Sequence, residues 1–312
     1  MNGKSERFLR SLSATAGFVA KYIGVFAVLA LIAGTLLVLV NGSWLSIQQN
    51  GLSFFTGTDW APNMDKYGGL TIIYGTLVST LIAMIIAVPL SLVIALFLVE
   101  LAHPVVSRIF GTAIELLAAI PSIIFGMWGF FVLMPLMQNH VQPLLQTIFG
   151  KEFFLFAGPP RGSGLLTAGI ILSIMILPFI SAVARDVMTM VPPVVKESAY
   201  GVGATSWEVT RGVSFRYGLQ GLIGGAFLGL GRALGETMAV AYVIGSSPRF
   251  SASITQPSYS IPSAIANQFG EAEPLHKSAL VELALVLFAI TCCIQIAYFL
   301  WMRRMKRSVG VL

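Results

Sequence analysis

Two charged side chains stand alone in one of the most apolar stretches of this sequence. The segment Leu219–Gly245 has 27 residues, of which only Arg232 and Glu236 are charged. An ionised side chain at the centre of a membrane helix costs about 2.5–3.5 kcal/mol on insertion scales, so such residues normally face the protein interior or a wet path. A spacing of four places both on one helix face, where each can neutralise the other. This pair is the first candidate for chemistry.

The chemistry that suits such a pair is recognition of an oxyanion. The planar donor fork of Arg232 matches phosphate oxygens. Glu236 should repel an anion unless that anion carries a proton to donate, and phosphate near neutral pH keeps a P–OH group that sulfate lacks. The pair therefore favours protonated phosphate, and its near-zero net charge avoids trapping the ion. The structural alternative is a salt bridge that only packs against a partner helix.

The elements that must hold this pair are membrane helices. Of the 312 residues, 56% are hydrophobic and only 10% are charged, whereas soluble domains have about a quarter charged. A bilayer core of about 30 Å needs about 20 apolar residues of helix. Six segments meet or nearly meet that length, which predicts an all-α polytopic membrane protein with six transmembrane helices: Tyr22–Val40, Leu70–Val99, Leu116–Met137, Leu165–Ala184, Leu219–Gly245 and Leu283–Met302.

The basic residues predict how these helices are oriented. Residues 1–21, Arg108, the loop 185–218 and residues 303–312 together hold 13 of the 19 Lys and Arg, whereas the opposite loops hold 5. By the positive-inside rule, residues 1–21 and 303–312 form cytoplasmic termini around a single transmembrane domain, 22–302. The net charge of +6 is explained by this asymmetry and needs no nucleic-acid partner. The first span is expected to be an uncleaved helix.

The cytoplasmic loop 185–218 has a pattern of its own. Pro192 and Pro193 interrupt the helix that leaves the fourth span, and "VVKESAYGVG" predicts a short helix that ends near Gly203. The "TSWE" that begins at Thr205 has capping-box spacing and predicts a second short helix through Phe215. Two short helices joined by a glycine turn could form a docking surface for a partner protein. The alternative interpretation is a generic interfacial loop without a partner.

Several catalytic motifs are absent from the sequence. It contains no G-x-x-x-x-G-K-[ST] phosphate loop, no G-x-S-x-G nucleophile motif and no cluster of His, Cys, Asp and Glu with metal-ligand spacing. We therefore expect a transport protein without enzymatic activity, metal or cofactor of its own. Any uphill transport must draw energy from a partner or from an ion gradient.

The first helix of the cytoplasmic loop resembles the E-A-A-x-x-x-G motif of ABC importer permeases. Glu197, Ala199 and Gly203 fall on its Glu, second Ala and Gly, and Ser198 replaces the first Ala. The resemblance implies that Glu197, Ala199 and Gly203 couple this chain to an ATPase.

The second half of that motif, I-x-L-P, is matched less well. Val213 takes the Ile position, but Phe215 and Arg216 replace Leu and Pro. The second helix is therefore expected to end differently from that of the family.

Four longer stretches resemble phosphate-specific ABC permeases, and their C-type half in particular. They are "YGTLVSTLIAMIIAVPLSLVIALFLVELA", "ELLAAIPSIIFGMWGFFVLMP", "ESAYGVGATSWEV" and "GLGRALGETMAVAYVIG", and the resemblance covers nearly all of residues 67–245. It implies a type I ABC importer permease fold and a transport path that includes Arg232 and Glu236.

The same resemblance implies the assembly and its location. The partners would be a second, A-type permease, a pair of ATPase subunits that use ATP and Mg inside, and a phosphate-binding protein outside. The assembly would import phosphate across the bacterial plasma (inner) membrane. Two alternatives stay open: an ABC permease for another oxyanion, and a self-contained proton-coupled anion transporter.

Overall fold

The computed structural model describes residues 3–308, and the side chains of residues 21–305. The described chain is mostly helical, which confirms the predicted polytopic α-helical class. Its only named strands form a short antiparallel hairpin, β1 (Trp60–Ala61) and β2 (Lys66–Tyr67), in which Trp60 lies opposite Tyr67.

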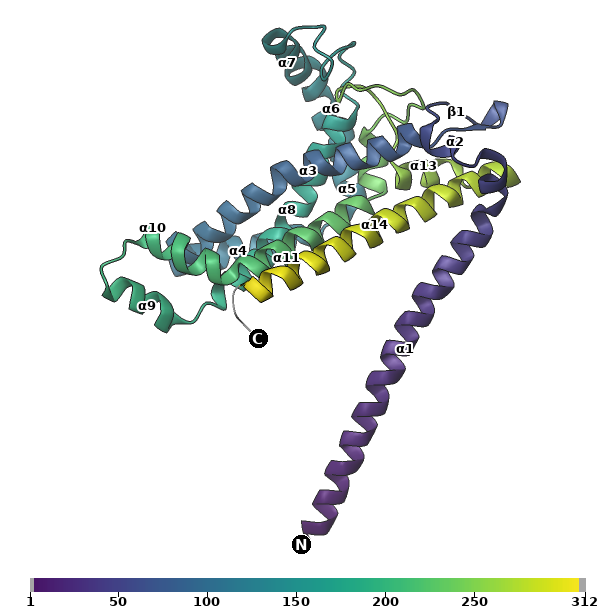
Figure 1. Cartoon of the computed structure of the whole chain (residues 1–312). Coiled ribbons are helices and arrows are strands. Elements are labelled where there is room, and N and C mark those ends of the chain that lie inside the picture. Colours follow the sequence, from purple (N-terminus) through teal and green to yellow (C-terminus); the bar gives the residue numbers. More distant parts are fainter. Residues whose placement is uncertain (1–2, 309–312) are drawn as a thin grey trace.

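Four long helices run side by side through the body of the molecule (Figure 1). They are α3 (Leu70–Leu96), α8 (Leu165–Thr189), α11 (Phe215–Leu234) and α14 (Pro274–Ser308). The longest helix, α1 (Gly3–Asn50), meets α14 near the hairpin and diverges from it toward its own N-terminus.

The third predicted span is built from several helical pieces. Helix α4 (Pro104–Ala118) ends before a turn at Pro121, and α5 begins at Ser122, so the predicted helix start at Leu116 is wrong. Proline cannot continue the hydrogen bonding of α4, which explains the break. From Ser122 the chain stays helical to Phe149, through α5 (Ser122–Trp128), a π-helical segment (Gly129–Leu133), α6 (Met134–Leu136), a second π-helical segment (Met137–Val141) and α7 (Gln142–Phe149).

Short elements lie at the two ends of the bundle. They are α2 (Ser53–Thr56), the 3₁₀ turn Pro62–Met64 and α13 (Ile261–Gln268) at one end, and α9 (Pro193–Gly201), α10 (Ser206–Val209) and a π-helical segment (Thr210–Ser214) at the other.

Five described helical stretches are long and apolar enough to cross a bilayer. They are Lys21–Asn50, Leu70–Leu101, Ser122–Phe149, Leu165–Thr189 and Pro274–Met305. The remaining predicted span, 219–245, is occupied by two helices: α11 ends at Leu234, and α12 (Met238–Val243) follows after three non-helical residues.

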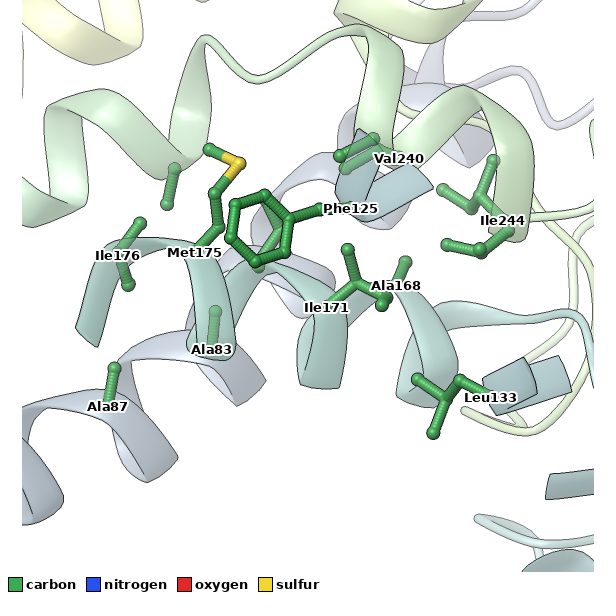
Figure 2. Close-up of a cluster of buried hydrophobic side chains, with 14 of the residues drawn as sticks. Ala83, Ala87, Phe125, Leu133, Ala168, Ile171, Met175, Ile176, Val240 and Ile244 are labelled. Carbon is green, nitrogen blue, oxygen red and sulfur yellow. The ribbon is translucent and has the colours of Figure 1, made fainter. Parts of the chain in front are cut away.

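Helix α8 lies at the centre of the packed core. In its most apolar window 61% of residues are buried, against 6% for the stretch in α14 and none for the one in α1. Figure 2 shows Met175 and Ile176 of α8 among Ala83 of α3, Phe125 of α5 and Val240 of α12. Small residues such as Ala83 let neighbouring helices approach closely in a membrane. Helices α1 and α14 keep broad apolar faces that no other described residue of the chain covers.

Candidate substrate pathway and coupling surface

The chain around Arg232 and Glu236 is not one continuous helix. Helix α11 ends at Leu234, and Gly235 is its C-cap residue. The break redirects the chain so that α12 packs on α5, where a Cβ on Gly126 would lie 3.0 Å from Ala239 Cα. Tertiary packing therefore imposes a turn within a segment whose composition alone predicts a single span.

This turn corrects the predicted pairing. No ion pair joins Arg232 to Glu236, or to any other carboxylate whose side chain the structure describes. Glu236 Oε1 instead accepts a hydrogen bond from the Ala239 backbone N–H at 3.2 Å and so caps the start of α12. An acidic side chain is favourable there because the first N–H groups of a helix lack partners. The prediction of mutual neutralisation across one helical turn is wrong, since the helix ends between the two residues.

Arg232 is left as an accessible cation at the end of α11. Its side chain is exposed, and its guanidinium carbon lies 5.9 Å from the centroid of the Phe179 ring of α8. A cation over an aromatic face gains a modest attraction that leaves the outer N–H donors free. The pathway role that the sequence predicts for Arg232 and Glu236 stays a prediction. In the structure the two side chains make separate contacts: Glu236 accepts from the α12 backbone, and Arg232 lies over Phe179.

The glycines before Arg232 form a packing stripe against α8. A Cβ on Gly225 would lie 2.9 Å from Val183 Cγ1, and one on Gly229 would lie 2.6 Å from both Cγ1 and Cδ1 of Ile180. Only residues without a side chain allow this approach. By contrast, a Cβ on Gly231 would meet nothing within 4 Å, so this glycine is not part of the packed stripe.

The first predicted helix of the cytoplasmic loop is present as α9, which follows the Pro192–Pro193 break as expected. Glu197 is exposed and Ala199 is half-buried. Gly203 ends the turn with a φ of +87°, in the left-handed region that favours glycine. The three motif residues therefore lie together on one helix and its terminating turn, and their role in coupling stays a prediction.

The second predicted helix starts as expected but does not end at Phe215. Thr205 Oγ1 accepts from the Glu208 N–H, and the Thr205 N–H donates to the Glu208 carboxylate, which completes the capping box. The Thr205 N–H and the Thr205 hydroxyl both donate to the Glu208 carboxylate and lower the pKa of Glu208 below its usual value. From Ser206 the chain stays helical through to Leu234. Arg216 takes the motif position where the family has proline, so nothing interrupts the helix.

Helix α9 is attached to the bundle through a carboxylate that the sequence analysis did not identify. Glu100 lies at the π-helical end of α3 (Phe97–Leu101), and its Oε1 accepts from Lys196 Nζ and from Ser214 Oγ, each at 2.7 Å. The side chains of Glu100 and Lys196 are only 9% and 20% exposed. No local sequence pattern predicts this contact, because Glu100, Lys196 and Ser214 lie far apart in the sequence.

Two acids near span ends also find partners or burial that the sequence does not reveal. Glu115 pairs with Arg185 and so links α4 to α8. Glu282 is only 3% exposed, whereas carboxylates at span ends are expected to be solvated. Helix α1 covers it through Ser46, a contact that composition cannot predict.

Comparison with known proteins places this architecture in a family. Residues 87–307 match the family described as "Binding-protein-dependent transport system inner membrane component". The phosphate transport system permease protein PstC of Pasteurella multocida (strain Pm70) is 51% identical over 293 residues, which are 93% of this chain and 91% of that protein. The PstC protein of Haemophilus influenzae (strain ATCC 51907 / DSM 11121 / KW20 / Rd) is 52% identical over 287 residues, 91% of each.

A more distant relative has the same family assignment, and a solved structure of an ABC transporter has a similar fold. A probable PstC protein of Methanocaldococcus jannaschii is 36% identical over 272 residues, 85% of this chain and 86% of that protein. The fold resembles a bacterial alginate ABC transporter crystallised with its alginate-bound periplasmic protein, with a TM-score of 0.56 and 15% identity over 98% of each chain. The resemblance to ABC importer permeases is thus confirmed, and the chain belongs to the family of binding-protein-dependent transport system inner membrane components.

Proposed function

We propose that this chain is the C-type permease subunit of an ATP-driven importer of inorganic phosphate. Its PstC relatives are phosphate transport system permeases, and the match covers about nine-tenths of both chains. The substrate path would lie along the α11–α12 turn, between this chain and a second, A-type permease. The membrane is the bacterial inner membrane, with both termini in the cytoplasm.

The observation that carries the proposal is the accessible guanidinium of Arg232. A cation in a membrane segment without a carboxylate partner is costly unless it serves a polar path. Its donor fork matches two oxygens of a phosphate group. Glu236 sits four residues away but already accepts from the α12 backbone, so it limits the net positive charge without occupying the fork.

Energy would enter from the cytoplasmic face. A pair of ATPase subunits, which bind ATP and Mg, would dock on α9. Glu197, Ala199 and Gly203 would form part of the docking surface. The four α9-region apolar side chains Val194, Val195, Tyr200 and Val202 are all exposed, as a docking surface requires. A phosphate-binding protein would deliver substrate at the opposite end, beside α13 and the hairpin.

Two alternative functions would require different features of the site or of the fold. An ABC permease for another oxyanion would use the same fork with a different size and protonation preference. A self-contained proton-coupled transporter would need no ATPase, and inverted repeats with interrupted helices in both halves are its usual mark. Family membership favours the ATP-driven importer over the second alternative.

The test is uptake of radiolabelled phosphate by proteoliposomes that contain this chain, the A-type permease, the ATPase and the binding protein. Uptake should require ATP, and Arg232→Gln should reduce it by at least tenfold, which corresponds to about 1.4 kcal/mol. Arg232→Lys keeps the charge but loses the fork and should be intermediate. Arg108→Gln removes an exposed cation outside the path and should transport normally.

Two results would contradict the proposal. Uptake without the ATPase would favour the proton-coupled transporter. Normal ATP-driven phosphate uptake by Arg232→Gln would remove Arg232 from the path, and preferential uptake of sulfate by the unmodified protein would assign another oxyanion.

A further inference from the structure

The guanidinium group of Arg232 lies over an aromatic ring from the neighbouring helix. Its carbon is 5.9 Å from the centroid of the Phe179 ring of α8, within the distance of about 6 Å at which a cation is attracted to an aromatic face. Phe179 is half-buried, whereas Arg232 is exposed. The ring therefore contacts one side of the guanidinium group and leaves the rest of it accessible.

The position of this ring is set by the core of the protein. Pro178 and Ile180, on either side of Phe179, are both buried, and the stretch in α8 is the most buried of the five apolar helical stretches. Ile180 also lies against α11, because a Cβ on Gly229 would be 2.6 Å from its side chain. Gly229 precedes Arg232 by less than one helical turn. Core packing thus places the ring beside the last turn of α11, where α8 and α11 run side by side (Figure 1).

An aromatic ring stabilises a cation without occupying all of its hydrogen-bond donors. The negative face of the ring attracts the charge as a whole, so the attraction does not depend on a particular N–H group. A carboxylate would instead accept from the N–H groups and neutralise the charge, and no carboxylate that the structure describes pairs with Arg232. Phe179 therefore offsets part of the cost of a charge in an apolar segment while the donor fork stays available.

Without the ring, Arg232 has a competing partner in its own helix. Arg232 lies in the last turn of α11, and the last carbonyl groups of a helix lack N–H partners within that helix. These carbonyl groups carry partial negative charge and attract basic side chains. A guanidinium group that turned back to them would use its donors within the protein. The attraction to Phe179 favours the position in which those donors remain free.

We propose that Phe179 is a positioning residue for the oxyanion site. Its ring holds the guanidinium group of Arg232 away from the end of α11, with the donor fork free for phosphate, and Phe179 itself does not touch the substrate. The inference rests on the proposed role of Arg232 in the substrate path. It requires that uptake depend on the electron density of the ring and not only on its size.

The experiment varies the charge distribution of the ring while its shape stays nearly constant. Phenylalanine with one, two or three ring fluorines is incorporated at position 179 of the complete transporter, because each fluorine makes the ring face less negative. ATP-driven uptake of radiolabelled phosphate is then measured per assembled complex. We expect uptake to fall stepwise, by about three- to tenfold for the trifluorinated ring, the range of one cation–π attraction. Phe179→Tyr keeps a negative ring face and should retain uptake, whereas Phe179→Leu should lose it at least as far as the trifluorinated ring.

Two controls show whether the effect passes through the cation. The same fluorinated residues at Phe110, an exposed phenyl group of α4, should leave uptake unchanged. In a complex that carries Arg232→Gln, the residual uptake should not respond to fluorination at position 179, because no cation lies over the ring.

A flat fluorination series, in a complex whose uptake still falls with Arg232→Gln, overturns the positioning role and leaves Arg232 in the path. An equal decline with and without Arg232 also overturns it, because the ring would then act on something other than the guanidinium group. Normal phosphate uptake by Arg232→Gln contradicts the proposed function itself, and the role of Phe179 falls with it.

Discussion

Lys196 of α9 is joined to Glu100, 96 residues earlier at the end of α3, by a hydrogen-bonded ion pair of 2.7 Å. Ser214 donates to the same carboxylate oxygen. Three segments therefore meet at one atom: the end of α3, the helix that we expect to contact the ATPase, and the start of the helix that carries Arg232. A rigid link of this kind could transmit a movement of α9 to the substrate path.

The first prediction tests that link. Glu100→Gln should weaken the attachment of α9 by about 1–3 kcal/mol, because it replaces a charge-assisted bond by a neutral one. We expect less phosphate transported per ATP hydrolysed in the reconstituted complex, with the subunits still assembled. Lys196→Met should have the same effect, and the double variant should be no worse than either single one. An unchanged ratio of transport to hydrolysis would mean that the contact only stabilises the fold.

The second prediction concerns the turn at Gly203. Its φ of +87° costs an L-residue about 1–2 kcal/mol, and Gly203→Leu adds bulk beside the expected docking surface. This variant should insert normally yet fail to couple ATP hydrolysis to uptake. Gly203→Asn tolerates the left-handed conformation better and should retain much of the activity. If Gly203→Leu transports normally, the turn has no part in coupling.

The third prediction separates Glu236 from Arg232. Glu236→Gln keeps an oxygen acceptor for the Ala239 N–H, so the complex should assemble normally, release phosphate more slowly and reject sulfate less well. Glu236→Ala loses the cap and should destabilise α12 by about 1 kcal/mol. The exchange Arg232→Glu/Glu236→Arg should assemble but not transport, because the two residues do not pair. Normal transport by the exchanged protein would restore the salt-bridge interpretation.

The fourth prediction uses the capping box on the cytoplasmic face. Hydrogen bonds from the Thr205 N–H and hydroxyl hold the pKa of Glu208 below its usual value. A carboxyl group with a lowered pKa stabilises the folded state above its unfolded pKa, and this stabilisation is lost as the pH falls through the folded pKa. The protection factors of the α10 amides, which correct for the pH dependence of the intrinsic exchange rate, should therefore fall on acidification, and Thr205→Ala should show low protection even at neutral pH. An identical acid response in both proteins would rule out the capping box as its cause.

The fifth prediction distinguishes packed from free glycines in α11. Gly229→Val should destabilise the protein by about 1–3 kcal/mol, because its side chain would collide with Ile180 of α8. Gly231→Ala meets open space and should be neutral or stabilising by up to about 1 kcal/mol. Thermal unfolding in detergent measures both. Equal stability of the two variants would show that the glycine stripe does not set the distance between α8 and α11.

Much of this protein is determined by its sequence alone. The length and polarity of the apolar runs predict the membrane helices, because a bilayer leaves the backbone no alternative to internal hydrogen bonds. Pro192 and Pro193 predict the start of α9, and Thr205 predicts the start of α10, because both signals act within one helical turn. The motif around Gly203 is recognisable for the same reason: its residues are neighbours in the chain.

The tertiary structure decides how those pieces are used. The turn after Leu234 exists because α12 must pack on α5, and it frees Arg232 from Glu236 even though their spacing fits a helical pair. Glu282 is buried because α1 happens to cover it. Glu100 finds Lys196 only when α3 and α9 come together. Each of these outcomes depends on contacts between residues distant in sequence, whose geometry no local spacing or composition encodes.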